Sequence, residues 1–283
     1  IFGNAKYYAD TSFQELLRAS TYGSIGHETA PGSLMQTAEF LDGYRITEGV
    51  RSGGDVAWKM QIKDSLRFYL PSKSYLSYSN LPKSLFPALK KFFIYQIYGS
   101  FLDIQNNIKD LYLGVALVLS IILIPKWNYI VGWDSIFFIP HITKIFFLSL
   151  SIIIFISFTI NRIFFRTFSP NSFRANSLKL ILFFLITYSI FNWNAVVAKW
   201  VEDSIWYIPH ITKIFVSLIF GASFIYRGIY FPLKSNIRFS YLFPYRWFLV
   251  GILGILLDLV KAPGYLLGAI LASFVRRTKN IHG

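Results

Sequence analysis

The chain has 283 residues, of which 54% are hydrophobic, 19% aromatic and 15% charged, and its formal net charge is +14. Soluble domains carry about 25% charged residues, so this composition excludes an ordinary soluble protein and indicates a membrane protein. Many Lys and Arg residues flank apolar stretches, where they orient helices and contact anionic headgroups, so the positive charge does not predict nucleic-acid binding. The absence of cysteine excludes disulfides, thiolate metal sites and a cysteine nucleophile.

Residues 1–80 are predicted to be part of a soluble α/β domain, because glycine and proline interrupt a mixture of apolar and polar residues. Hydrophobic periodicity predicts helices over Thr11–Tyr22 and Val56–Leu66. A short strand is expected over Arg67–Leu70 and an extended segment over Tyr75–Tyr78. The expected fold class is therefore a partial α/β domain followed by an all-α transmembrane region.

Residues 81–107 are predicted to form an amphipathic interfacial helix. Leu85, Leu89 and Phe92 share one face, while Lys90 and Lys91 lie elsewhere, as in helices that lie in the headgroup plane. The alternative is an ordinary helix packed on the soluble domain. We favour the interfacial position because a membrane segment follows directly.

Residues 108–226 are predicted to form four transmembrane helices arranged as two duplicated hairpins. Each apolar stretch approaches the roughly 20 residues that a membrane span needs. The predicted spans are Leu111–Pro125 with a start near Ile108, Ile136–Ile160, Leu178–Val197 and Ile205–Tyr226.

The distribution of basic residues predicts the orientation in the membrane. The loop between the second and third spans holds Arg162, Arg166 and Arg174, whereas the turns over Lys126–Asp134 and Lys199–Asp203 are close to charge-balanced. By the positive-inside rule, residues 1–80 and the Arg-rich loop are expected on the cytoplasmic side of a plasma or inner membrane.

Residues 227–283 are predicted to hold a basic segment and C-terminal membrane-associated helices. Trp247–Val275 is long enough to span a membrane but contains Asp258, Lys261 and Pro263. Spanning would also place the basic tail outside, against the positive-inside rule. We therefore expect a re-entrant or interfacial helix pair, with Asp258 and Lys261 paired because they lie three positions apart.

A sequence repeat links the two predicted hairpins. The segment Asp134–Phe146 recurs as Asp203–Phe215, and Trp127-Asn128 is echoed by Trp193-Asn194. A match of this length indicates duplication of one hairpin into the other.

Two interpretations of the repeat remain open. In the structural one, which we favour, each copy supplies an aromatic belt, a proline-started helix and a lysine that reaches the interface. In the functional one, His141, His210, Lys144 and Lys213 line a passage for a lipid phosphate or a sugar chain. Two histidines without nearby carboxylates are a weak indication of a metal site.

The motif with the clearest chemical content places a carboxylate on a glycine turn. Gly53 and Gly54 precede Asp55 directly before a predicted helix, and Trp58 follows one turn later. Asp55 alone is typical of a helix N-cap. A carboxylate in this position can also take a proton from an attacking hydroxyl group, and paired glycines let the backbone pass close to a bulky sugar.

Together with Gly32–Ala38, the run Arg51–Trp58 resembles the second half of a family 2 (GT-A type) glycosyltransferase domain. In that family, a Gly-Ser-Leu-x-x-Thr-Ala-like segment lies beneath the acceptor site, and the acid of a Gly-Gly-Asp-type motif is the catalytic base. The resemblance implies that Asp55 is the base of an inverting transfer. It also implies that a substrate site is formed by Ser33, Gln36, Glu48, Arg51, Gly53, Gly54 and Trp58.

The resemblance implies the partners as well: a nucleotide-sugar donor, a lipid-linked or glycan acceptor, and membrane lipids. The family's first βαβ unit and its Asp-x-Asp motif do not occur before Ile1. A divalent metal, Mg²⁺ or Mn²⁺, is therefore expected to be held mainly by an N-terminal half missing here, and the fragment is expected to be inactive alone. No Gln/Arg-x-x-Arg-Trp segment follows Trp58, which argues against a processive polymerase.

The alternative function is a non-enzymatic multi-pass membrane protein, a transporter or scaffold with a small cytosolic domain. Repeated hairpins are common in transporters. Against this alternative, the predicted hairpins hold few polar residues at mid-membrane depth, and four spans are few for a transporter.

Overall fold

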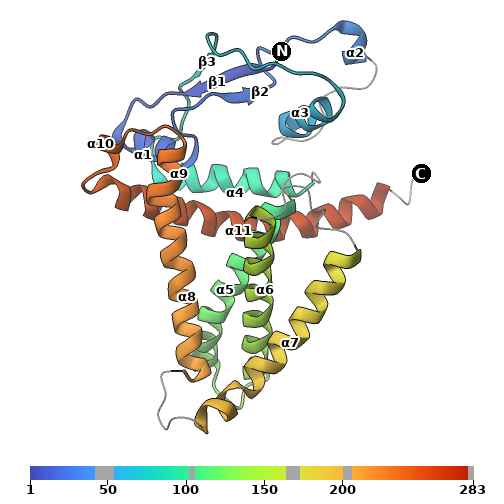
Figure 1. The fold of residues 1–283 in the computed structure, drawn as a ribbon, viewed down its shortest axis with the longest axis vertical. Helices are drawn as coiled ribbons and strands as arrows, with labels where there is room; N and C mark the ends of the chain where they lie inside the picture. Colours follow the sequence, from blue (N-terminus) through green and yellow to red (C-terminus); the bar gives the residue numbers. More distant parts are fainter. Residues whose placement is uncertain (42–53, 102–105, 164–172, 200–205, 280–283) are drawn as a thin grey trace. The chain divides into compact units, whose positions relative to one another are not determined.

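The computed structural model describes residues 1–41, 54–101, 106–163, 173–199 and 206–279 (Figure 1). These residues are mostly helical and include one small sheet. The chain divides into two compact units. We call Ile1–Ile104 with Ala222–Gly283 the head unit, and Gln105–Gly221 the hairpin unit, and describe each by itself.

The sheet of the head unit has three strands in the order β2-β1-β3 (Figure 1). The central strand β1 (Gly3–Tyr7) pairs antiparallel with β2 (His27–Thr29) and parallel with β3 (Leu76–Tyr78). β3 confirms the predicted extended segment. The strand predicted over Arg67–Leu70 is wrong: Phe2 N donates to Tyr69 O at 2.9 Å, but the segment forms no ladder with β1.

Helix α1 (Ser12–Thr21) confirms the first predicted helix, and its start is determined by a capping box. Gln14 N donates to Thr11 Oγ1 at 3.2 Å, and Thr11 N donates to Gln14 Oε1 at 3.1 Å. This arrangement satisfies backbone donors that have no partner within the helix. Gln14 Nε2 also donates to Leu81 O at 2.7 Å in a buried position, so the cap joins α1 to the segment that leads into α4.

Two helices flank the segment 42–53, which lies outside the described residues. The first is the short α2 (Thr37–Leu41), and the second is α3 (Gly54–Ser65), which confirms the second predicted helix. α3 starts at Gly54, so Asp55 lies in the first turn and not at the N-cap. Trp58 and Ile62 of α3 pack with Phe2 in a small core beside the sheet.

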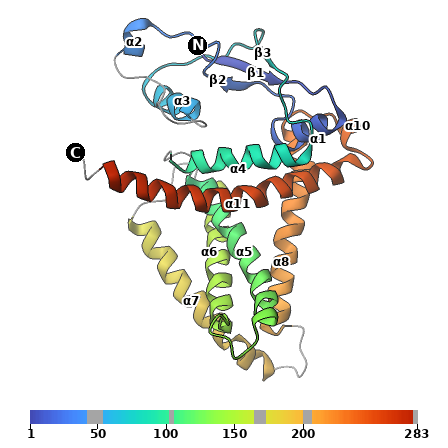
Figure 2. The same cartoon turned by 180° about the vertical axis from the view of Figure 1, so that it is seen from behind.

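Helices α4 (Leu85–Phe101) and α11 (Arg246–Lys279) run side by side in the same direction (Figures 1 and 2). Leu81 and Ala88 form a buried cluster with Leu253, Leu257 and the α1 residue Leu17. α11 is continuous through Pro263, so the prediction of a C-terminal helix pair is wrong. α11 packs against α4 on both sides of this proline.

Three short elements lead from α8 into α11. The π-helix η1 (Tyr226–Tyr230) is followed by α9 (Phe231–Lys234) and α10 (Phe239–Leu242). Ile237, Leu242 and Val250 form a core with Ala19 of α1. The predicted basic segment is therefore folded against the head.

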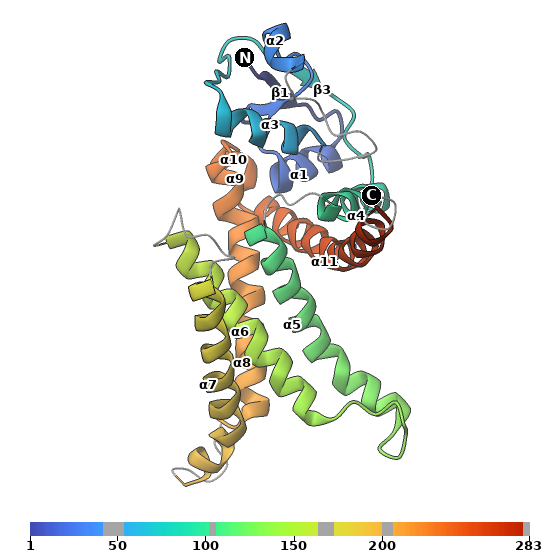
Figure 3. The ribbon, with the colours of Figure 1, turned by 90° about the vertical axis from the view of Figure 1, so that its right-hand side faces the viewer.

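The hairpin unit consists of long helices. α5 packs on α6, and α6 packs on α7 (Figure 3). Their bounds are Asn106–Val131 for α5, His141–Ile163 for α6, Phe173–Ala198 for α7 and Ile208–Ile225 for α8, whose last residues belong to the head unit.

Four helices of the described residues are long and apolar enough to cross a membrane. This number agrees with the prediction, and it supports a membrane protein in contact with lipid. The four helices are not the four predicted ones. The apolar part of α6 is only His141–Ser157 and is too short, whereas the C-terminal helix α11 is long enough. The first span is longer than predicted, since Pro125 lies inside α5. The qualifying segments are Leu113–Val131, Ser177–Ala198, His210–Lys234 and Arg246–Ala272.

Candidate functional site

Asp55 lies in the first turn of α3, in the head unit, and its charge acts on Tyr7, which belongs to a cluster of aromatic side chains. We call this set the head aromatic cluster; it comprises Tyr7, Tyr22, His27, Tyr78, Phe92 and Tyr95. Its members come from β1, the end of α1, β2, β3 and α4, so it lies where the sheet meets α4.

The rings of the head aromatic cluster are in direct contact. Tyr7 stacks on Tyr22 with a centroid distance of 3.8 Å and an interplanar angle of 18°. The ring centres of His27 and Tyr78 each lie 5.5 Å from the ring centre of Tyr7. Phe92 of α4 continues the contact from Tyr22 at 6.3 Å. The polar sheet and the apolar helix are therefore joined by a layer of rings.

The electrostatics of the cluster follow from burial and from Asp55. Burial raises the pKa of Tyr7 above its usual value, and the charges of Tyr78, Tyr95 and Asp55 raise it further. Burial likewise raises the pKa of Tyr22. At neutral pH the phenols of Tyr7 and Tyr22 are therefore uncharged.

Lys91 of α4 lies on the same side of the head as Tyr95, with its ammonium nitrogen 5.5 Å from the centre of that ring. Burial lowers the pKa of Lys91, because removal from water disfavours the charged form. The cation–π contact favours the charged form and partly offsets this cost.

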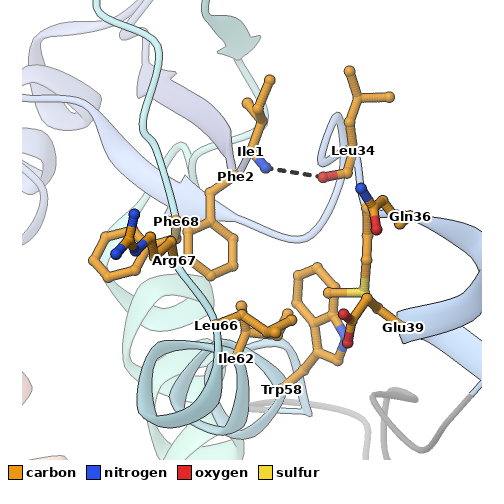
Figure 4. A pocket seen from close by; sticks show the side chains of 11 residues that line it. Ile1, Phe2, Leu34, Gln36, Glu39, Trp58, Ile62, Leu66, Arg67 and Phe68 are labelled. Atoms are coloured by element: carbon orange, nitrogen blue, oxygen red, sulfur yellow. Dashed lines mark hydrogen bonds between the residues drawn. The ribbon is translucent and has the colours of Figure 1, made fainter.

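Two of the predicted substrate residues line a cavity of about 410 Å³ in the head unit (Figure 4). Gln36 is exposed at its edge, and Trp58 contributes from α3. Trp58 is only 5% exposed and packs edge-on against Phe2, with ring centres 5.8 Å apart. It is therefore a core residue whose ring also bounds the cavity.

Ser33 connects two segments of the head through hydrogen bonds of its hydroxyl group. Its hydroxyl donates to Thr29 O at 2.8 Å and accepts from Gly3 N at 2.9 Å. The hydroxyl thus ties the loop after β2 to the central strand. Trp58 and Ser33 also share a second hollow of the head with Met35 and Phe40.

The remaining predicted residues fall into two groups. Gly54 is buried as the first residue of α3. Glu48, Arg51 and Gly53 lie outside the described residues. Within the part of the chain that the structure describes, no group of three or more His, Cys, Asp or Glu residues is placed to hold a metal ion.

Comparisons with protein-family models, curated proteins and solved structures found no match.

Sequence reasoning missed the aromatic cluster and two charged residues of the cavity. Glu39 and Arg67 line the cavity with Gln36 and Trp58 (Figure 4). The cluster tyrosines are scattered between positions 7 and 95, with no spacing that relates them, so only the packing of β1, β3, α1 and α4 brings them together.

Proposed function

We propose that the chain is the acceptor half of a membrane-anchored inverting glycosyltransferase. It would move a sugar from a nucleotide-sugar donor to a lipid-linked or glycan acceptor at the cytoplasmic face. Asp55 would be the general base. The observation that carries this proposal is an acidic residue in the first turn of a helix, with its charge raising the pKa of Tyr7, a member of the head aromatic cluster.

The chemistry assigned to Asp55 is proton abstraction. As the acceptor hydroxyl oxygen bonds to the anomeric carbon, Asp55 takes the hydroxyl proton, and the bond from that carbon to the donor phosphate oxygen breaks. The nucleoside diphosphate leaves, and the anomeric configuration inverts. A divalent cation, Mg²⁺ or Mn²⁺, would neutralise the diphosphate, held by a domain half that these residues do not include.

The head aromatic cluster supports a sugar or lipid-linked acceptor. Aromatic rings offer flat apolar surfaces of the kind that sugar rings and isoprenoid chains contact, and tyrosine adds a hydroxyl group at the edge. Phe92 and Tyr95 belong to α4, the helix predicted to lie at the membrane interface. An acceptor anchored in the bilayer would thus reach Asp55 along α4.

We also propose that α11 lies in the plane of the membrane interface together with α4. In the head unit, α1 packs on the N-terminal half of α11 at Leu253 and Leu257, and α4 packs on its C-terminal half at Gly264 and Gly268. A helix covered by head elements along both halves has little length left for a bilayer. Its apolar composition suits the other face for contact with lipid.

The transporter alternative has less support from the hairpin unit. Ser149 and Ser151 are fully buried in α6, but their hydroxyls donate to the carbonyl oxygens of Ile145 and Leu148 in the same helix, at 2.8 and 2.9 Å. These polar groups are satisfied internally and offer no lining for a polar passage.

The test is a transfer assay with the protein expressed from its whole gene in membranes. Membranes are incubated with radiolabelled nucleotide sugars, and label is counted in extracted lipid and polymer. We expect Asp55→Asn to lower the rate by roughly 10²–10⁴-fold, the usual contribution of a general base. The matched control is Asp10→Asn, a substitution of an exposed head carboxylate. Full activity of Asp55→Asn, or no transfer by the wild type from any donor, overturns the proposal.

A further inference from the structure

The sequence repeat has a structural counterpart in the hairpin unit, because the repeated Trp residues make the same hydrogen bond. Trp127 Nε1 donates to Phe137 O at 2.9 Å, and Trp193 Nε1 donates to Trp206 O at 2.7 Å. Phe137 and Trp206 occupy the same position of the repeated segment. The two indoles therefore make equivalent hydrogen bonds to the two turns.

The repeated Asn residues act alike. Asn128 Oδ1 accepts from Ile139 N at 2.9 Å, and Asn194 Oδ1 accepts from Ile208 N at 2.8 Å. Ile139 and Ile208 are again equivalent in the repeat. The bonded backbone lies two residues before the start of α6 in the first copy and at the first residue of α8 in the second.

Residues that follow the two repeated turns line a shared cavity. His141 and Lys144 of the first copy, and Thr212 and Lys213 of the second, line one cavity of about 330 Å³. Lys144 and Lys213 are the same position of the repeat. The duplication thus brings two equivalent ammonium groups to one cavity.

The rest of the cavity wall is apolar. It is formed by Ile121 and Pro125 of α5, Leu148 of α6 and Val216 of α8, with further isoleucines. No carboxylate of the described residues lines the cavity or pairs with Lys144 or Lys213. An apolar cavity with two cations at positions near the helix starts has the shape and charge for an acyl or isoprenoid chain ending in phosphate.

We propose that this cavity binds a phosphate-bearing lipid, with Lys144 and Lys213 contacting the phosphate and the apolar wall contacting the chain. His141 adds a further hydrogen-bonding group to the cavity wall, whereas the Thr212 hydroxyl donates to Ile208 O at 2.7 Å. The positive ends of α6 and α8 favour the anion further. This site lies in the hairpin unit and shares no residue with the candidate site of the head unit.

The experiment is lipid binding by native mass spectrometry on the whole protein in a neutral detergent. The probes are 1-palmitoyl-2-oleoyl phosphatidylglycerol and the phosphatidylcholine with the same chains. We expect one phosphatidylglycerol to bind in preference to phosphatidylcholine. Lys144→Gln with Lys213→Gln should weaken that binding by roughly 10- to 30-fold, because each lysine contributes favourably to contact with an anionic headgroup.

The matched control is Lys126→Gln with Lys199→Gln, which removes the same charge from exposed positions near the same turns but outside the cavity wall. The control pair should bind as the wild type does, and Lys144→Arg with Lys213→Arg should retain binding. Equal loss in the control pair would show diffuse attraction and overturn the proposal. Displacement of the lipid by inorganic phosphate at equal concentration would assign the cavity to a free anion and also overturn it.

Discussion

At the scale of single residues, three half-buried charges of the head unit form an ion-pair cluster. Asp258 accepts from Arg227 at 2.6 Å (Nε) and 2.5 Å (Nη2), and from Lys261 at 3.1 Å. The predicted pairing of Asp258 with Lys261 is confirmed, and Arg227 from η1 completes it. A Cβ at Gly254 would lie 2.9 Å from Arg227 Cβ, so the glycine leaves the space that the Arg227 side chain occupies. A two-pronged Arg–carboxylate pair of this kind fixes η1 on α11.

The buried phenol of Tyr22 should make the folded state less stable as the pH rises into the alkaline range. Tyr22 stays protonated in the folded state above the usual tyrosine pKa of about 10, whereas the unfolded chain ionises there. Folding stability is therefore fully present below pH ~10 and is lost as pH rises further, by up to about 1.4 kcal/mol per pH unit for this group. Tyr22→Phe should flatten the fall in Tm between pH 9 and 11, measured by tryptophan fluorescence.

The control for this prediction is Tyr69→Phe, because Tyr69 is 61% exposed. Its pH profile should match that of the wild type. If Tyr22→Phe and Tyr69→Phe gave the same slope, burial of Tyr22 would not be the cause of the alkaline loss.

At the scale of elements, α4 and α11 approach closely because α11 carries Gly264 and Gly268. A Cβ at Gly268 would lie 2.5 Å from Ile97 O and 2.7 Å from Ser100 Oγ. Ser100 Oγ in turn lies 3.3 Å from Tyr265 O. Small residues four positions apart let two helix backbones come together, as is common in membrane-associated helices.

This contact predicts opposite effects for two alanine substitutions. Gly268→Ala should destabilise the head by about 1–3 kcal/mol, since the added methyl group meets the α4 backbone. Gly99→Ala, on α4 with nothing within 4 Å of its Cβ position, should be neutral or stabilise by up to about 1 kcal/mol through helix propensity. Thermal unfolding in detergent measures both. Equal melting temperatures for the two variants would contradict the close approach.

At the scale of the whole molecule, the lack of cysteine permits a direct test of membrane orientation. Single cysteines are introduced as Ser72→Cys in the head, Ile136→Cys in the first hairpin turn, and His282→Cys in the tail. By the positive-inside rule, a membrane-impermeant maleimide should label Ile136→Cys in intact cells. It should label Ser72→Cys and His282→Cys only after permeabilisation.

The tail cysteine decides the position of α11. If α11 lies in the interface plane, residue 282 stays on the side of the head. If His282→Cys is labelled from outside while Ser72→Cys is not, α11 crosses the membrane and the interfacial placement is wrong.

Much of the local structure was predictable because it depends on neighbouring residues. The α1 helix follows from the spacing of its apolar residues and from the Thr11–Gln14 cap, and the apolar stretches of α5, α7 and α8 follow from composition. The short strands β1 and β2 were not predicted, since three to five residues carry little pattern and their pairing joins distant segments. Asp55 was identified from its glycine turn, but its electrostatic effect on Tyr7 was not predicted.

The sequence by itself determined that this is a membrane protein, that its hairpins are duplicated and that Asp55 lies at the start of a helix. These properties depend only on composition and on residues that are neighbours in the chain. Only the tertiary structure decided that α11 is one helix packed along α4, that aromatic rings from positions 7 to 95 form one cluster, and that Lys144 and Lys213 share a cavity. The reason is physical: each of these depends on close packing between segments far apart in the chain, where small residues and side-chain shape decide contacts that no local pattern encodes.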